Sequence, residues 1–153
     1  RIEIRRQLFD LTKRGIELGF LSKSDRDIAP ELAPIESAAG AYADAARAID
    51  ARLLESASTS RLTAAQQTRI NQLLIAADRA WLSEDGIPGR PWFRSLYAAS
   101  DEDSGYASWI LPGLRWCIEH KDKAQLVHET DRLLAVLNHL NAVMAEIDTT
   151  LKN

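Results

Sequence analysis

The sequence predicts an all-α protein, a four-helix bundle with one long loop, and two observations lead to this prediction. Gly and Pro are few, 7 and 5 of 153 residues, and most of them lie in residues 86–91 and 105–113. The rest of the chain is rich in Ala, Leu, Arg, Glu and Gln, which favour helices. Several segments there repeat apolar residues in steps of three and four, which is the spacing of one helix face.

Three helices are expected in the first half of the chain. Residues 2–19 have Leu and Ile near helical spacing, although two glycines weaken this pattern. Residues 32–55 carry one continuous apolar stripe among many alanines, so that a neighbouring helix could approach closely. The third helix is expected at 63–82, because Thr63 followed by Gln66 is a capping-box signature.

Two further helices are expected at the C-terminal end. Pro112 is well placed as the first residue of a short helix through residue 120. The last helix is expected at 122–150, with a seam of nearly coiled-coil regularity that includes Thr130. The main residues of this dimer or bundle seam are Leu126, Leu133, Leu137, Leu140, Met144 and Ile147. Further apolar residues widen the arc to about 200°, so we expect this helix to be buried on two sides, inside a bundle or between chains.

Residues 84–111 lose the helical period and concentrate aromatic residues, Pro and Gly. A loop of this length is usually functional or packed on another part of the protein. Gly89 and the residue pair that follows it predict a turn that delivers two aromatic side chains at a fixed angle. We assign the architecture of this loop to Arg90, Pro91, Trp92, Phe93, Arg94, Pro112 and Gly113.

Each side chain of this loop also has an ordinary structural interpretation. We expect Trp92, Phe93 and Trp109 to fill the core, and for Tyr106 core filling and ligand contact are the two alternatives. Arg94 could bind backbone carbonyls or a carboxylate of the acidic cluster at 101–103. That cluster is faintly similar to a calcium loop, but its Gly and its last ligand position do not fit. We therefore expect its carboxylates to be solvated charges.

Composition argues against several classes of protein. The formal net charge is −3, and without a long basic run nucleic acid is not an expected partner. No apolar stretch approaches the roughly 20 residues of a membrane span, so we expect no membrane contact by this segment. The single Cys117 cannot form an internal disulfide, and its apolar neighbours predict a buried, unreactive thiol. The chain begins without Met, which indicates a mature form or a piece of a larger protein.

The residues themselves do not assemble a catalytic or metal site. His128 and His139 share a helix face, but they lie about 16 Å apart along the axis and cannot share an ion. We expect both to be solvated. No metalloprotease motif and no phosphate-binding loop occurs, so we assign no metal ligand and no catalytic residue.

Two blocks of sequence carry a resemblance. Residues 71–81 and 86–94 contain a helix ending in an aromatic residue, a Gly-Ile-Pro turn, Arg-Pro, two aromatics and Arg. Residues 97–114 add Tyr-Ala twice and then Pro-Gly-Leu, with six positions from Tyr106 to Pro112. These blocks resemble the C-terminal, transferrin-receptor-like dimerisation domain of the glutamate carboxypeptidase family, and the resemblance covers about residues 32–150.

The resemblance implies a helical dimerisation domain at 32–153, preceded at 1–31 by a linker or an accessory helix. It implies a homodimer whose loop packs on a zinc aminopeptidase-like protease domain of the parent protein. Both zinc ions and the catalytic residues would lie in that domain, which this segment lacks, so the chain alone would be non-catalytic and without a cofactor. Relatives are mostly extracytoplasmic, and some are receptors that have lost catalysis.

The resemblance also points to one substrate-binding residue. Tyr106 matches a tyrosine that reaches into the substrate pocket of the carboxypeptidases. Gly105 stands where the family has a lysine that pairs with the substrate carboxylate, so a preference for acidic peptides is not implied here. The alternative to this whole interpretation is a stand-alone helical-bundle scaffold or binding protein, since bundles recur without shared function.

Overall fold

The structure of the protein is a computed structural model, and the residues that it describes are 2–58 and 62–152. These residues form five helices and two short strands, and the chain is mostly helical. In chain order the elements are α1 (Ile2–Glu17), α2 (Ala33–Ser58), α3 (Ala64–Arg79), β1 (Ala98–Ser100), β2 (Ser108–Ile110), α4 (Pro112–His120) and α5 (Lys123–Lys152). The five predicted helices are confirmed, with ends that differ by a few residues.

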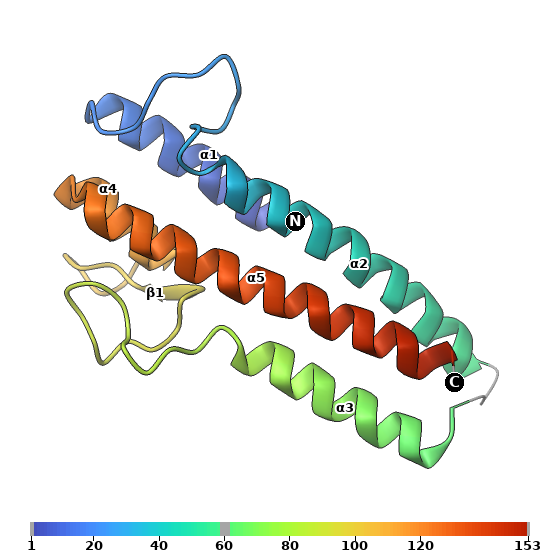
Figure 1. Cartoon of the computed structure of the whole chain (residues 1–153). Coiled ribbons are helices and arrows are strands. Elements are labelled where there is room, and N and C mark those ends of the chain that lie inside the picture. The colour runs from blue at the N-terminus through green and yellow to red at the C-terminus, as the bar shows by residue number, and fades with distance from the viewer. Residues whose placement is uncertain (1, 59–61, 153) are drawn as a thin grey trace.

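The long helix α5 is the centre of the domain (Figure 1). α2 and α3 lie along its two sides and both pack against it. α1 packs against α2 and α4 near the end of the domain where α5 begins. The expected burial of α5 on two sides is confirmed by this arrangement. Three long helices thus form one layer, and α1 and α4 are added at one end, so the contacts do not establish a regular four-helix bundle.

Local signals begin the helices where the sequence predicts. At the start of α3, the hydroxyl of Thr63 accepts the N–H of Gln66 at 3.3 Å, and the Gln66 side chain accepts the N–H of Thr63 at 2.9 Å. This is the predicted capping box. Pro112 is the first residue of α4, where its missing N–H costs no helical hydrogen bond.

Helix α1 is an integrated part of the fold. Leu8 and Leu11 are buried in the same core as the residues of α5. Arg14 makes a two-pronged ion pair with Glu119 of α4, at 3.0 Å and 2.8 Å, and this hydrogen bonding holds the pKa of Glu119 below its ordinary value. In the structure, therefore, residues 2–17 form a helix that packs on the rest of the domain.

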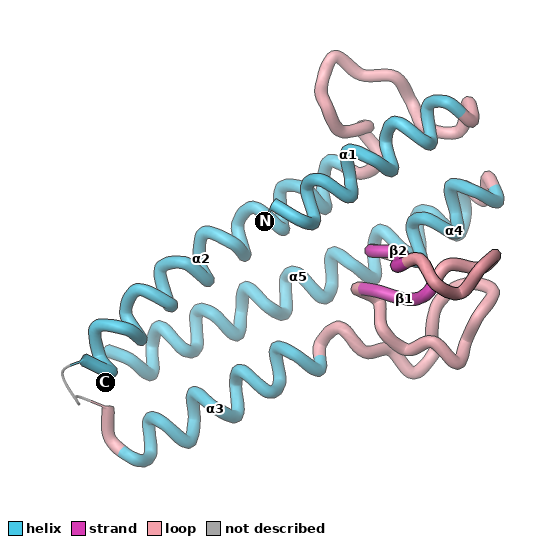
Figure 2. Tube along the Cα trace, turned by 180° about the vertical axis from the view of Figure 1, so that it is seen from behind, coloured by secondary structure: helices cyan, strands magenta, loops and turns pink. Residues whose placement is uncertain are grey.

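The interval between α3 and α4 contains a small sheet that the sequence analysis did not predict. β1 and β2 pair antiparallel, with Ala99 opposite Trp109, and they lie beside α4 (Figure 2). Strands of three residues are too short to show the alternation of apolar and polar side chains by which strands are predicted. The all-α prediction is corrected to a mostly helical fold with one two-stranded sheet.

The seam of α5 lies in the core of the single chain. All six main seam residues are buried, and Val136 and Val143 beside them are buried as well. Val127, on the other flank, is exposed. Because the seam side chains already pack within one chain, a second subunit would have to bind through other residues. None of the helices in the described part of the chain is long and apolar enough to cross a membrane.

Candidate functional site

Residues 81–111 fold into an ordered structure that we call the aromatic loop. The backbone N–H of Ser83 donates to the carbonyl of Arg94 at 2.9 Å. The N–H of Leu96 donates to the carbonyl of Trp81, also at 2.9 Å. These bonds bring the two ends of the first turn together just after α3. The aromatic loop is therefore held by backbone pairing as well as by the two-stranded sheet.

Two glycines make the first turn of the aromatic loop possible. Gly86 and Gly89 both adopt positive φ, +67° and +73°, a conformation that other residues rarely take. A Cβ on Gly86 would overlap the backbone carbonyl of Pro91, and one on Gly89 would lie 2.7 Å from Nε1 of Trp116. The turn predicted at Gly89 is thus confirmed, and Gly86 is needed for a close backbone approach.

Arg90 is the buried centre of the aromatic loop. Its side chain is only 9% exposed, and Nη1 donates to the carbonyl of Ser100 at 2.7 Å. The guanidinium lies 4.9 Å from the ring centroid of Phe93 and 5.5 Å from that of Trp109, within cation–π range. The carbonyl-binding role that the sequence suggested for Arg94 is therefore filled by Arg90, because the turn directs this side chain inward.

Asp101 contradicts the expectation of a solvated charge. It is 9% exposed, whereas Glu102 and Asp103 are exposed as expected. Its Oδ1 accepts the backbone N–H groups of Ser104 at 2.5 Å and Gly105 at 2.7 Å. Its Oδ2 accepts the Ser104 hydroxyl at 2.6 Å and a further backbone N–H at 2.8 Å. These hydrogen bonds, first of all the one from the Ser104 hydroxyl, hold the pKa of Asp101 well below its usual range.

Two of the aromatic side chains point into solvent. Tyr106 is 96% exposed and Trp92 is 70% exposed. The expectation of core filling is therefore wrong for Trp92, and of the two alternatives for Tyr106 core filling is excluded. Phe93 and Trp109 are half-buried, and Phe93 packs against the core as predicted. The rings of Phe93 and Trp109 lie against the guanidinium of the buried Arg90, whereas the residues around Tyr106 are held by hydrogen bonds to Asp101.

A buried ion pair joins α5 to the aromatic loop, and the sequence analysis missed it. Glu129 is 1% exposed, and its Oε1 accepts Nη1 of Arg132 at 2.6 Å and Nε2 of Gln125 at 3.1 Å. Nη2 of Arg132 donates to the Ser83 hydroxyl at 2.7 Å and to the Gly86 carbonyl at 2.8 Å. The pair therefore fixes the first turn of the aromatic loop against the central helix.

Glu129 also explains the glycine at the second position of α4. A Cβ on Gly113 would overlap the carboxylate of Glu129, so glycine leaves room for this side chain in its observed position. The sequence contained a signal for it. Glu129 lies three residues after Leu126 and four before Leu133, so it has the spacing of a seam residue, as its neighbour Thr130 does. A charged residue on a buried stripe is found with a partner, and Arg132 one turn later is the nearest candidate.

The remaining chemically active side chains do not form a site. Cys117 is buried as predicted, and burial, aided by the negative charges of Glu129 and Asp122, raises its thiol pKa to about 12. His128 and His139 are exposed. Within residues 2–58 and 62–152, no three His, Cys, Asp or Glu side chains lie together so that they could hold a metal ion. The described residues therefore do not fit the zinc pair that the resemblance implies for the parent protein.

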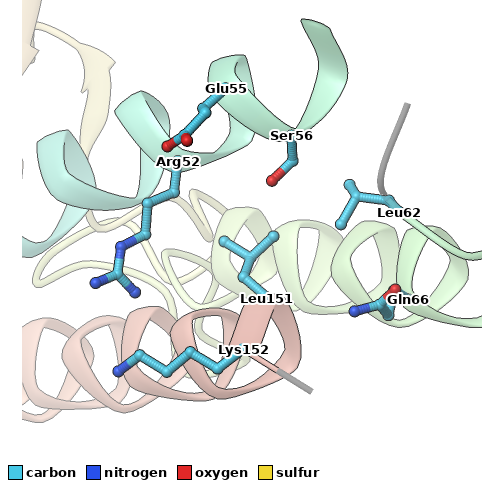
Figure 3. A pocket seen from close by; sticks show the side chains of 7 residues that line it. All are labelled: Arg52, Glu55, Ser56, Leu62, Gln66, Leu151 and Lys152. Atoms are coloured by element: carbon cyan, nitrogen blue, oxygen red, sulfur yellow. The ribbon is translucent and has the colours of Figure 1, made fainter. Parts of the chain in front are cut away.

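A hollow of about 300 Å³ lies where the ends of α2 and α5 meet the start of α3 (Figure 3). It is lined by Arg52, Glu55, Ser56, Leu62, Gln66, Leu151 and Lys152. Arg52 and Lys152 both bind Asp148, and Nε2 of Gln66 donates to the Thr150 carbonyl at 2.9 Å. These polar groups hold the three helix ends together, and we assign no chemical role to the hollow.

The fold and its ordered loop define a helical domain that presents aromatic side chains at its surface. A family model, the transferrin receptor-like dimerisation domain, matches residues 30–145. This is more than half of the chain, and the protein belongs to this family. Comparisons with curated proteins and with solved structures gave no significant match. The predicted resemblance to this dimerisation domain is thus confirmed, and the match says nothing of the glutamate carboxypeptidase parent.

Proposed function

We propose that this chain is the dimerisation domain of a glutamate carboxypeptidase-like zinc metallopeptidase, or of a receptor relative, and that it pairs with a second copy of itself. The observation that carries the proposal is the family match over residues 30–145. A dimerisation domain acts by self-association, and a symmetric pair of identical chains is the commonest form of assembly. The domain has no catalytic role when alone.

Exposed apolar side chains support self-association. Because the α5 seam packs within one chain, the interface must use other residues. Besides Trp92 and Tyr106, the large apolar residues that remain exposed in the described part of the chain are Phe9, Leu54, Leu74, Ile75, Leu82 and Val127. Apolar surface that is gathered in one place is what protein interfaces cover, whereas single exposed leucines are ordinary. The adjacent Leu74 and Ile75 on α3 are the clearest pair.

The aromatic loop supports the second part of the proposal, that it packs on a protease domain of the parent chain. Trp92 and Tyr106 stand in solvent on a loop that is otherwise internally bonded. Trp and Tyr are enriched at interfaces because they combine a large apolar area with one polar group. Tyr106 would donate its hydroxyl to a substrate carboxylate or carbonyl, and zinc would be held by the protease domain.

Sedimentation equilibrium should show a dimer. Over a wide range of concentrations, the chain should move from its monomer mass of 17.0 kDa toward twice that mass. The measurement is made on the chain of 153 residues, without any partner. A mass that stays at 17.0 kDa up to high micromolar concentration would contradict self-association by this chain. That result would favour the stand-alone scaffold.

Replacing Tyr106 by Phe in the full-length parent protein should weaken substrate binding. A hydrogen bond to a charged group contributes about 1.5–3 kcal/mol, so KM should rise roughly 10-fold or more, while the fold is unchanged. Steady-state kinetics provide the measurement. The control is Tyr42→Phe, which removes the hydroxyl of a half-buried tyrosine on α2 and should leave KM unchanged. An unchanged KM for Tyr106→Phe would remove this residue from the substrate site.

A further inference from the structure

We propose that Asp101 is a positioning residue that holds the tip of the aromatic loop, residues 104–107, in one shape before any partner or substrate is bound. The inference rests on the proposed function in one respect, namely that Tyr106 contacts a substrate or the protease domain. The order of the tip itself is a property of this chain. Three observations lead to this conclusion. Asp101 accepts four hydrogen bonds from the tip, the backbone at Asp101 is held by the sheet and Arg90, and the tip is otherwise exposed.

Both oxygens of the Asp101 carboxylate accept hydrogen bonds from residues of the tip. Each of its oxygens accepts two hydrogen bonds, at 2.5–2.8 Å, and three of the four donors are backbone N–H groups. The fourth donor is the hydroxyl of Ser104, whose oxygen in turn accepts the N–H of Tyr106 at 3.2 Å. One side chain thus determines the path of the backbone on both sides of Tyr106.

Only an ionised carboxylate can make this set of bonds. An asparagine at position 101 would have a single acceptor oxygen, and its NH₂ group would face an N–H donor in place of the second oxygen. Hydrogen bonds to an ionised acceptor are also about twice as strong as neutral ones. Replacement of Asp101 by Asn therefore removes the charge and one acceptor oxygen, while the side chain keeps nearly the same size and shape.

The base from which Asp101 projects is itself fixed. Its backbone N–H donates to the carbonyl of Ala107 at 2.8 Å, directly after the strand pair in which Ser100 lies opposite Ser108. Nη1 of the buried Arg90 binds the carbonyl of Ser100 at 2.7 Å. The Asp101 side chain therefore connects the tip to a backbone segment that the sheet and Arg90 hold in place.

The tip is exposed at each of its four residues. Tyr106 is almost fully exposed, and a Cβ on Gly105 would have no atom within 4 Å. Gly105 is needed there for its positive φ of +73°, a conformation that turns the chain toward Tyr106. Polar contacts to Asp101 thus replace packing as the source of order. A tip that is ordered in advance loses less conformational entropy when it binds, which raises affinity.

Backbone ¹⁵N relaxation on the 153-residue chain tests the inference. In the wild type, the amides of Gly105, Tyr106 and Ala107 should have order parameters near those of rigid backbone, about 0.85. In Asp101→Asn they should fall below about 0.6, while the helices keep their values and the thermal midpoint changes little. The matched control is Asp103→Asn, which removes the same charge from an exposed neighbour and should leave the tip ordered.

A second variant keeps the inference testable if Asp101→Asn does not fold. Ser104→Ala keeps the carboxylate but removes one donor to Asp101 and the acceptor for the N–H of Tyr106, so it should loosen the tip by an intermediate amount. Low order parameters in the wild type, or unchanged values in Asp101→Asn and Ser104→Ala, would overturn the inference.

The outcome is separable from that of the proposed function, because relaxation needs neither a partner nor a substrate. An unchanged KM for Tyr106→Phe would remove the substrate role and leave the positioning by Asp101 intact. A mobile tip in the wild type would have the opposite effect: it would overturn the positioning role and leave self-association and the substrate role standing.

Discussion

Replacing Arg132 by Met should lower the free energy of unfolding by about 3 kcal/mol, because it leaves the carboxylate of Glu129 buried without its cation. The variant also loses the hydrogen bonds to Ser83 and Gly86 that attach the aromatic loop to α5. Urea unfolding followed by circular dichroism measures the change. The Met side chain retains most of the apolar stem, so the effect reports the lost polar contacts.

Two further variants separate this buried pair from ordinary surface charge. Arg69→Met breaks an exposed ion pair with Glu146 and should cost less than about 1 kcal/mol. Adding Glu129→Gln to Arg132→Met removes the unpaired buried charge, so the double variant should be more stable than Arg132→Met alone. A cost of Arg132→Met no larger than that of Arg69→Met would contradict a structural role for the pair.

Gly86→Ala should lower the free energy of unfolding by about 3 kcal/mol or more, for a different reason. The new Cβ would overlap the backbone carbonyl of Pro91, which cannot move aside as a flexible side chain can. The positive φ of +67° adds conformational strain for any residue with a side chain. The same urea unfolding experiment provides the measurement.

Other glycines of the chain supply graded controls for Gly86→Ala. Gly105→Ala has a similar φ of +73° but open space around the new Cβ, so it should cost only about 1 kcal/mol. Gly40→Ala lies within α2, again in open space, and should stabilise the chain by roughly 0.5–1 kcal/mol. If Gly86→Ala cost no more than Gly105→Ala, the close approach to Pro91 would be shown to be unimportant.

The helices could be predicted to within a few residues at their ends because the signals that form them are local. The range 32–55 corresponds to α2 at Ala33–Ser58, and 122–150 corresponds to α5 at Lys123–Lys152. The capping box at Thr63 and the Pro at the start of α4 place helix ends through contacts between near neighbours in sequence. Periodicity and caps need no knowledge of the rest of the fold.

The candidate site could be predicted only in part. The sequence indicated a loop with a turn at Gly89. It offered Arg94 as a ligand of backbone carbonyls or of a carboxylate, whereas the arginine that binds a carbonyl of the loop is Arg90. It treated Asp101 as solvated, although its bonds to residues 104–107 are local, and an Asp followed by Ser-Gly at this spacing is a signal for such a turn. The exposure of Tyr106 could not be predicted, because an aromatic residue in a loop can point either way.

The sequence by itself determined the helical class, the order and the approximate ends of the helices, and the family, since each of these depends on residue types at short spacing. The tertiary structure decided which charged groups are buried. Glu129 and Arg132 are ordinary neighbours on a helix until Gly113 and the Ser83–Gly86 turn pack against them. The physical reason is that burial depends on the element packed opposite a side chain, and that element comes from a distant part of the sequence.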